Sequence, residues 1–223
     1  MATPPLEEIV QKPELVEVFD LQGNPLGPME RDEFYEQIRE EFERTGKITR
    51  QVKSIRAFLL SSTGMVYIQK RGPNKRQNPS LYDKPIAGHV PSGISYELTL
   101  VKEAAEELAV PVAITPAEEF DLAVRSINLD VVGIFRQIDY ISPFLSVRVE
   151  KDGTKFPQPF MSSFFIGYYN GTIRFSHEES TGIEVFSLDQ LKREIQVRPQ
   201  LFTEDKKFMI EKYAQYLVPL RKS

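Results

Sequence analysis

The sequence predicts a mixed α/β fold, because segments with strand periodicity alternate with segments with helix periodicity along its 223 residues. Glu14 to Asp20 alternates polar and apolar residues, which is typical of a half-buried strand. Asp32 to Arg44 spaces Phe34, Ile38 and Phe42 four residues apart, as one face of an amphipathic helix requires. We therefore expect one α/β (α+β) domain with additions at its ends.

The elements that follow fit this expectation. Two strand candidates flank a Thr63-Gly64 turn, which predicts a hairpin, and the chain from Phe120 to Phe175 is predicted to be mostly strand. Helices are expected over about Leu188 to Glu194 and about Thr203 to Leu217. The predicted organisation is an N-terminal strand and helix packed on the core (1–50), a central domain (51–198) and a C-terminal helix (199–223).

Composition excludes several classes of function. The chain has no cysteine, which excludes disulfides, cysteine-ligated metals and a thiol nucleophile. The net charge is −4 and no basic run is long enough for a nucleic-acid footprint, so we expect no binding to duplex nucleic acid. No apolar run approaches the length of about 18 residues that a membrane span needs, so a cytoplasmic location and no membrane partner are expected.

The most informative segment contains three glutamates with helical spacing. Glu103, Glu106 and Glu107 share one side of a predicted helix, and Leu98, Val101, Ala105 and Leu108 are predicted to form its apolar side. Like charges at this distance repel unless a cation lies between them, and hard divalent cations prefer such oxygen ligands. The cluster follows a turn at Gly88, and it is interpreted as a metal site.

The spacing of this segment resembles the Nudix box. Gly88 is followed after five residues by Ile94, and after seven more by Lys102-Glu103-Ala104-Ala105-Glu106-Glu107-Leu108-Ala109-Val110. The glycine and the three metal-binding glutamates of the family pattern are all present at the family's spacing. Three positions depart from it: Ile94 replaces a glutamate, Lys102 an arginine and Ala109 a glycine. Of the three departures Ala109 matters least, since Pro111 can end the helix in place of a left-handed glycine.

The resemblance implies a Nudix-type α/β/α sandwich with a mixed sheet, and a pyrophosphohydrolase activity. Glu103, Glu106 and Glu107 would hold Mg²⁺ or Mn²⁺, with the carbonyl near Gly88 as a further ligand, and one glutamate would act as the base. The substrate would be a nucleoside diphosphate-X or related organic diphosphate. The isopentenyl diphosphate isomerase branch is also similar but implies a catalytic cysteine, which this chain lacks. The alternative is a Nudix-fold nucleotide-binding regulatory module with little or no turnover, motivated by Ile94 and Lys102.

Basic residues precede the box and are candidates for phosphate binding. Lys70, Arg71, Lys75 and Arg76 end a strand and enter the next loop, where the alternative is that they are simply solvated. His89 follows the box glycine and is a candidate contact for a phosphate or a metal-bound water; the alternative is a loop histidine whose hydrogen bonds are satisfied within the protein. Glu178 or Glu179 is a candidate auxiliary ligand or base, and the alternative is a solvated loop.

The remaining aromatic residues are expected to serve packing. Phe208, Tyr213 and Tyr216 lie near helical spacing, which favours a packing helix, with a contact between two copies of the chain as the alternative. The box selects the diphosphate but not the group attached to it. Substrate choice was therefore assigned to the segment Asp121 to Phe175.

Overall fold

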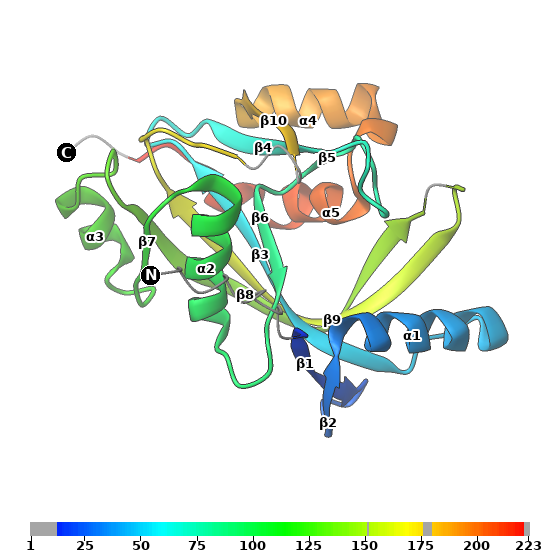
Figure 1. Ribbon diagram of the computed structural model, residues 1–223. Helices are drawn as coiled ribbons and strands as arrows, with labels where there is room; N and C mark the ends of the chain where they lie inside the picture. Colours follow the sequence, from blue (N-terminus) through cyan, green and yellow to red (C-terminus); the bar gives the residue numbers. More distant parts are fainter. Residues whose placement is uncertain (1–12, 151, 176–179, 221–223) are drawn as a thin grey trace, which may run out of the picture.

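The computed structural model describes residues 13–150, 152–175 and 180–220, and is built around one mixed β-sheet (Figure 1). Neighbouring strands in its main path are β10 (Ser180–Phe186), β4 (Val66–Arg71), β3 (Arg50–Leu60), β9 (Lys155–Tyr168), β8 (Gly133–Val149) and β7 (Val112–Ile114). β3 pairs parallel with β9 and β7 pairs parallel with β8, whereas the other neighbours are antiparallel. The mixed sheet confirms the predicted α/β class.

Helices cover both faces of this sheet because the side chains of β3 alternate between two cores. Ala57 and Leu59 pack in the core under α2 (Tyr96–Leu108). Phe58 and Leu60 pack in the opposite core, which also contains residues of α3 (Phe120–Ser126), α4 (Leu188–Val197) and α5 (Glu204–Tyr213). Two short 3₁₀ turns, η1 (Pro199–Leu201) and η2 (Ala214–Tyr216), flank α5. The arrangement is the expected α/β/α sandwich.

The N-terminal segment extends the sheet at one end. β1 (Leu15–Asp20) pairs antiparallel with β3 and with β2 (Pro25–Glu30). α1 (Arg31–Thr45) buries Phe34 and Ile38 against the end of the β8–β9 hairpin, beside which it lies in Figure 1. A third core therefore forms between the N-terminal elements and the projecting hairpin.

Two short strands carry the chain from β4 to α2. β5 (Tyr82–Asp83) pairs with β4, and β6 (Ile86–His89) pairs antiparallel with β3. The β3–β6 register puts Gly88 opposite Ile55. The loop after β6 leads directly into α2, and α2 packs back against β6. The glycine of the predicted box and its helix therefore lie side by side.

Several local expectations need correction. Phe120–Ser126 is helix α3, whereas the sequence favoured strand from Phe120 onward. The last helix ends at Tyr213 and continues only as the η2 turn. Phe208, Tyr213 and Tyr216 all pack in the core under α5. No helix in the described part of the chain is long and apolar enough to cross a membrane.

Candidate active site

The helix α2 begins at a capped N-terminus. The Ser95 hydroxyl accepts a hydrogen bond from the Leu98 N–H at 3.1 Å, which satisfies one of the unpaired amides of the first turn. Leu100, Ala104 and Leu108 then form the buried stripe, one turn apart. The predicted apolar face was therefore wrong in part, because Leu98 is 55% exposed and Val101 is 37% exposed. The helix is rotated so that a different row of side chains faces the sheet.

This rotation places Glu103 and Glu107 beside the buried stripe, facing β6. The Ala87 N–H donates a hydrogen bond to Glu107 Oε2 at 3.2 Å. Glu103 lies directly over Gly88: a Cβ at that position would be 2.8 Å from Glu103 Cγ and would overlap the carboxylate. Only glycine therefore leaves room for this glutamate, which gives a physical reason for the glycine of the box.

Glu106 lies one position further round the helix and is more open to solvent. Its side chain is 60% exposed and pairs with Lys102, with 3.8 Å between Nζ and Oε2. Within the described ranges, no three His, Asp or Glu side chains are close enough together to hold a metal ion.

The residues nevertheless fit a divalent cation in kind. Two carboxylates lie against β6, where Gly88 makes room for one of them. The third carboxylate, Glu106, points away and pairs with Lys102 on the helix surface. An ion pair of this kind within one helix is worth about 0.3–0.5 kcal/mol. Turning Glu106 from Lys102 towards a cation is therefore a small cost.

The departures from the box pattern have different consequences. Ile94 is 38% exposed, in the turn before α2. Ala109 adopts a left-handed backbone conformation with φ of 53°, and the N–H groups of Ala109 and Val110 donate to the carbonyls of Ala105 and Ala104. The expectation that Pro111 replaces a left-handed cap is thus wrong. The cap is present, and alanine occupies it at a conformational cost.

A cleft of about 510 Å³ opens in front of these glutamates, and we call it the inner cleft. The predicted site residues that line it are Gly88, His89, Arg71, Lys75, Glu103, Glu106 and Glu107. Among the described residues, the predicted Lys70 does not line this cleft. Its Nζ lies 5.6 Å from the centre of the Tyr82 ring instead. An outer cleft of about 690 Å³, walled by α1, continues from it and shares Arg31, Arg71, Lys75, His89 and Arg148 with it.

His89 is turned towards α1. Its Nε2 is hydrogen-bonded to the Tyr35 hydroxyl, which also accepts a hydrogen bond from Gln158 Nε2 at 3.1 Å. Burial, reinforced by the charge of Arg148, lowers the pKa of His89 to about 3, so the ring is neutral at neutral pH. In the neutral ring Nε2 accepts a hydrogen bond from the Tyr35 hydroxyl, so that nitrogen is engaged by the protein.

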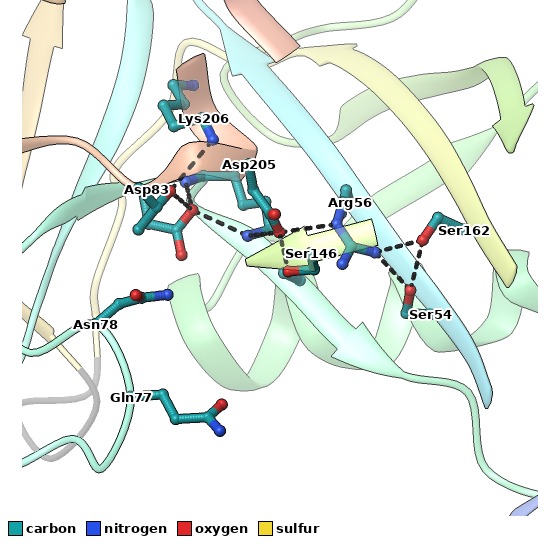
Figure 2. Close-up of polar contacts among 12 residues, drawn as sticks. Ser54, Arg56, Gln77, Asn78, Asp83, Ser146, Ser162, Asp205 and Lys206 are labelled. Atoms are coloured by element: carbon teal, nitrogen blue, oxygen red, sulfur yellow. Dashed lines mark hydrogen bonds and ion pairs between the residues drawn. The ribbon is translucent and has the colours of Figure 1, made fainter. Parts of the chain in front are cut away.

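The floor of the inner cleft holds a buried ionic network that the sequence interpretation missed (Figure 2). Arg56, with only 1% of its surface exposed, donates to Asp205 Oδ2 at 3.1 Å and to the hydroxyls of Ser54 and Ser162. Its guanidinium lies between the rings of Phe144 and Phe160, 4.5 and 4.9 Å from their centres. These contacts hold the guanidinium in place at Nε, at Nη1 and on its flat faces.

Lys84 joins this network to a second carboxylate. Its Nζ lies 2.9 Å from Asp83 Oδ1 and 3.3 Å from Asp205 Oδ2, and Arg71 lies 3.5 Å from Asp83 Oδ2. Burial alone would raise the pKa of the Asp205 carboxyl, but the charges of Lys84 and Arg56 outweigh it and hold that pKa well below its usual value. Both carboxylates are therefore ionised.

Arg148 of β8 is the other residue that the sequence did not reveal. It lines both clefts, and its guanidinium lies 5.4 Å from the centre of the Phe160 ring. One signal was available for Arg56, a lone arginine inside the apolar run of β3; Arg148 lies in a mixed polar strand that offers none. Glu178 and Glu179 lie outside the described residues.

The fold and the site share one defining arrangement. A helix that carries the three glutamates of the predicted box packs against the strand that contains Gly88, and both lie at the wall of a cleft lined by cations. No family model matches the chain. An uncharacterized Nudix hydrolase of Nostoc sp. is 25% identical over 162 residues, 71% of this chain and 83% of that protein. A Nudix hydrolase of Deinococcus radiodurans is 35% identical over 89 residues, 36% of this chain and 52% of that protein.

A solved structure shares the fold. The crystal structure of a Deinococcus radiodurans protein superposes with a TM-score of 0.59 at 20% identity, covering 89% of this chain and 98% of that chain. The chain is therefore similar in sequence to Nudix hydrolases, and it shares its fold with the Deinococcus radiodurans structure.

Proposed function

We propose that the protein is a divalent-metal-dependent hydrolase that cleaves a diphosphate linkage in a nucleoside diphosphate-X or related organic diphosphate. The observation that supports this most is the close approach of Glu103 to Gly88. It brings a carboxylate over a strand backbone at the wall of a cleft whose floor is cationic. Acidic and basic groups face the same space, as a metal-bound diphosphate requires.

In the proposed mechanism Glu103, Glu106 and Glu107 would hold Mg²⁺ or Mn²⁺. When bound, the ion would stabilise negative charge on the diphosphate and help to activate the attacking water. Arg71 and Lys75 line the same cleft and bind phosphate oxygens there. A carboxylate oxygen of the glutamate cluster accepts the proton of the attacking water. His89 is held by Tyr35 and helps to shape the passage between the two clefts.

The test is a hydrolysis screen with Mg²⁺ and Mn²⁺ over nucleoside triphosphates, nucleotide sugars, dinucleotides, coenzyme A and thiamine-type diphosphates. We expect one class to be cleaved by the wild type and not by Glu107→Gln. Glu97→Gln is the matched control, because Glu97 lies on the same helix but lines a different pocket. Equal loss in both variants would contradict the assignment.

A second candidate is a regulatory module that binds a nucleotide diphosphate without turnover. The pairing of Glu106 with Lys102, together with the exposed Ile94 in place of a glutamate, favours it. If the wild type binds substrates of the panel with measurable affinity but releases no phosphate product from any of them, this second function replaces the first.

A further inference from the structure

The floor of the inner cleft carries more positive than negative charge. Arg71, Asp83, Lys84, Asp205 and Arg56 form a chain of ion pairs. Arg148 adds a cation beside it, with its guanidinium over the same Phe160 ring as that of Arg56. Among these six residues, four cations stand against two carboxylates, which leaves two positive charges.

The positively and negatively charged side chains of this cluster occupy different positions relative to the cleft. Arg56, Arg71, Lys84 and Arg148 all line the inner cleft, whereas Asp83 and Asp205 lie behind them. Asp205 Oδ2 alone accepts from Arg56, Lys84 and the Ser146 hydroxyl, which fixes it as a support for the two cations. The cluster presents cations to the cleft and keeps its carboxylates out of it.

Arg148 is the member of the cluster without a carboxylate. It forms no ion pair with any residue in the described ranges, and its buried Nε has no hydrogen-bond partner. Burial lowers the pKa of the Arg56 guanidinium, Asp205 opposes that shift, and the charge of Arg148 adds to it. A buried polar group without a partner is unfavourable, and neither the contact with the Phe160 ring nor the attraction to Asp205 supplies the hydrogen bond that Nε lacks.

We propose that Arg148, Arg56 and Lys84 form a subsite for a terminal phosphate dianion of the substrate. A terminal phosphate carries a charge of about −1.5 to −2 at neutral pH, which matches the two uncompensated charges. A phosphate inside a diester linkage carries one charge and matches them less well. The substrate class is then an organic compound that ends in a diphosphate or triphosphate, in preference to a dinucleotide or nucleotide sugar. This choice of substrate rests on the proposed function.

The test measures binding without metal, so that it does not depend on turnover. Methyl phosphate and dimethyl phosphate are titrated into the full chain by calorimetry at neutral pH in the presence of a chelator. We expect methyl phosphate to bind about tenfold more tightly than dimethyl phosphate, the ratio that one charge-assisted hydrogen bond supports. Arg148→Met should weaken methyl phosphate binding by about tenfold or more.

The matched control is Arg39→Met. Arg39 is another partly buried arginine, but it pairs with Glu150 and lines the outer cleft without lining the inner one. It should leave methyl phosphate affinity unchanged. Arg148→Met should also keep or raise the urea midpoint of unfolding, because it removes an unpaired cation, which separates lost binding from lost folding.

The inference is overturned if methyl phosphate does not bind, if both phosphates bind equally, or if Arg148→Met keeps wild-type affinity. The screen under the proposed function reads out independently. Cleavage of a diphosphate without methyl phosphate binding refutes only the subsite. Binding that is lost in Arg148→Met, in a protein that hydrolyses nothing, supports the subsite and refutes only the proposed hydrolase.

Discussion

Asp205 is the carboxylate whose loss the structure predicts to be most damaging. The change Asp205→Asn keeps the shape of the side chain and removes its charge. Asp205 is the only described carboxylate that pairs with Arg56, whereas Lys84 retains Asp83. Both cations stay buried, at 1% and 4% exposure.

The magnitude follows from this burial. Breaking a buried ion pair by removing one partner costs about 3–5 kcal/mol, because an uncompensated charge remains in a low-dielectric site. A domain has a free energy of unfolding of about 5–15 kcal/mol in total, so Asp205→Asn should lose a large part of it. The adjacent Glu204 supplies the control. It pairs with Lys207 at 2.8 Å on the surface, and Glu204→Gln should cost less than about 0.5 kcal/mol.

The assay is urea unfolding at neutral pH, followed by circular dichroism. The double variant Arg56→Met with Asp205→Asn should be less destabilised than the sum of the two single changes, by about 0.5–3 kcal/mol, because it removes both members of the pair. If the free energies of unfolding of Asp205→Asn and Glu204→Gln differ by less than about 1 kcal/mol, then solvent reaches the network and the ion pairs are not buried as described.

The remaining predictions concern the box and acid stability. Ala109→Gly should raise the free energy of unfolding by about 0.5–1 kcal/mol. Relief of the left-handed alanine is worth about 1–2 kcal/mol, and the greater entropy of glycine in the unfolded state offsets part of that gain. An unchanged urea midpoint would contradict the left-handed cap. Gly88→Ala should displace Glu103 and weaken Mn²⁺ binding in a calorimetric titration. Gly93→Ala is the control: its new Cβ meets no atom within 4 Å, but the backbone φ of 78° is strained for alanine, so it should lose stability without losing Mn²⁺ affinity. The lowered pKa of Asp205 means that its stabilisation is present above its unfolded-state pKa of about 3.9 and is lost as pH falls below that value. The wild type should therefore lose stability more steeply between about pH 4 and pH 2 than Asp205→Asn does, and parallel curves would refute the pairing.

Much of the fold was predictable because its signals are local. The β3–β4 hairpin follows from strand periodicity on both sides of the turn at Thr63-Gly64, and α1 follows from apolar residues four apart. α3 was missed because it is only seven residues long and lies between strand-like segments. The buried face of α2 was misjudged because two apolar rows compete on that helix, and only packing on β6 selects the row of Leu100 and Ala104.

The site divides in the same way. The glutamates and Gly88 lie within one short segment, so their spacing carries the prediction, and the structure adds its reason in the contact between Glu103 and Gly88. The pairing of Arg56 with Asp205 joins residues 149 positions apart. No local pattern encodes such a pair. Its only trace is a charged residue in an apolar strand, which shows that a partner is needed but not where it lies.

The ionic floor also bears on why the cleft is built from charges at all. Well-packed apolar side chains in place of a buried ion pair are often as stabilising or more so. Stability alone therefore does not account for Arg56, Lys84 and Asp205, and it accounts still less for Arg148, which forms no ion pair with any of the described residues. What the arrangement provides is a set of cations held rigidly before any ligand arrives, so that binding an anion costs little ordering of side chains. α5 supplies Asp205, and through it the C-terminal helix fixes the charges that face the glutamates of α2 across the cleft.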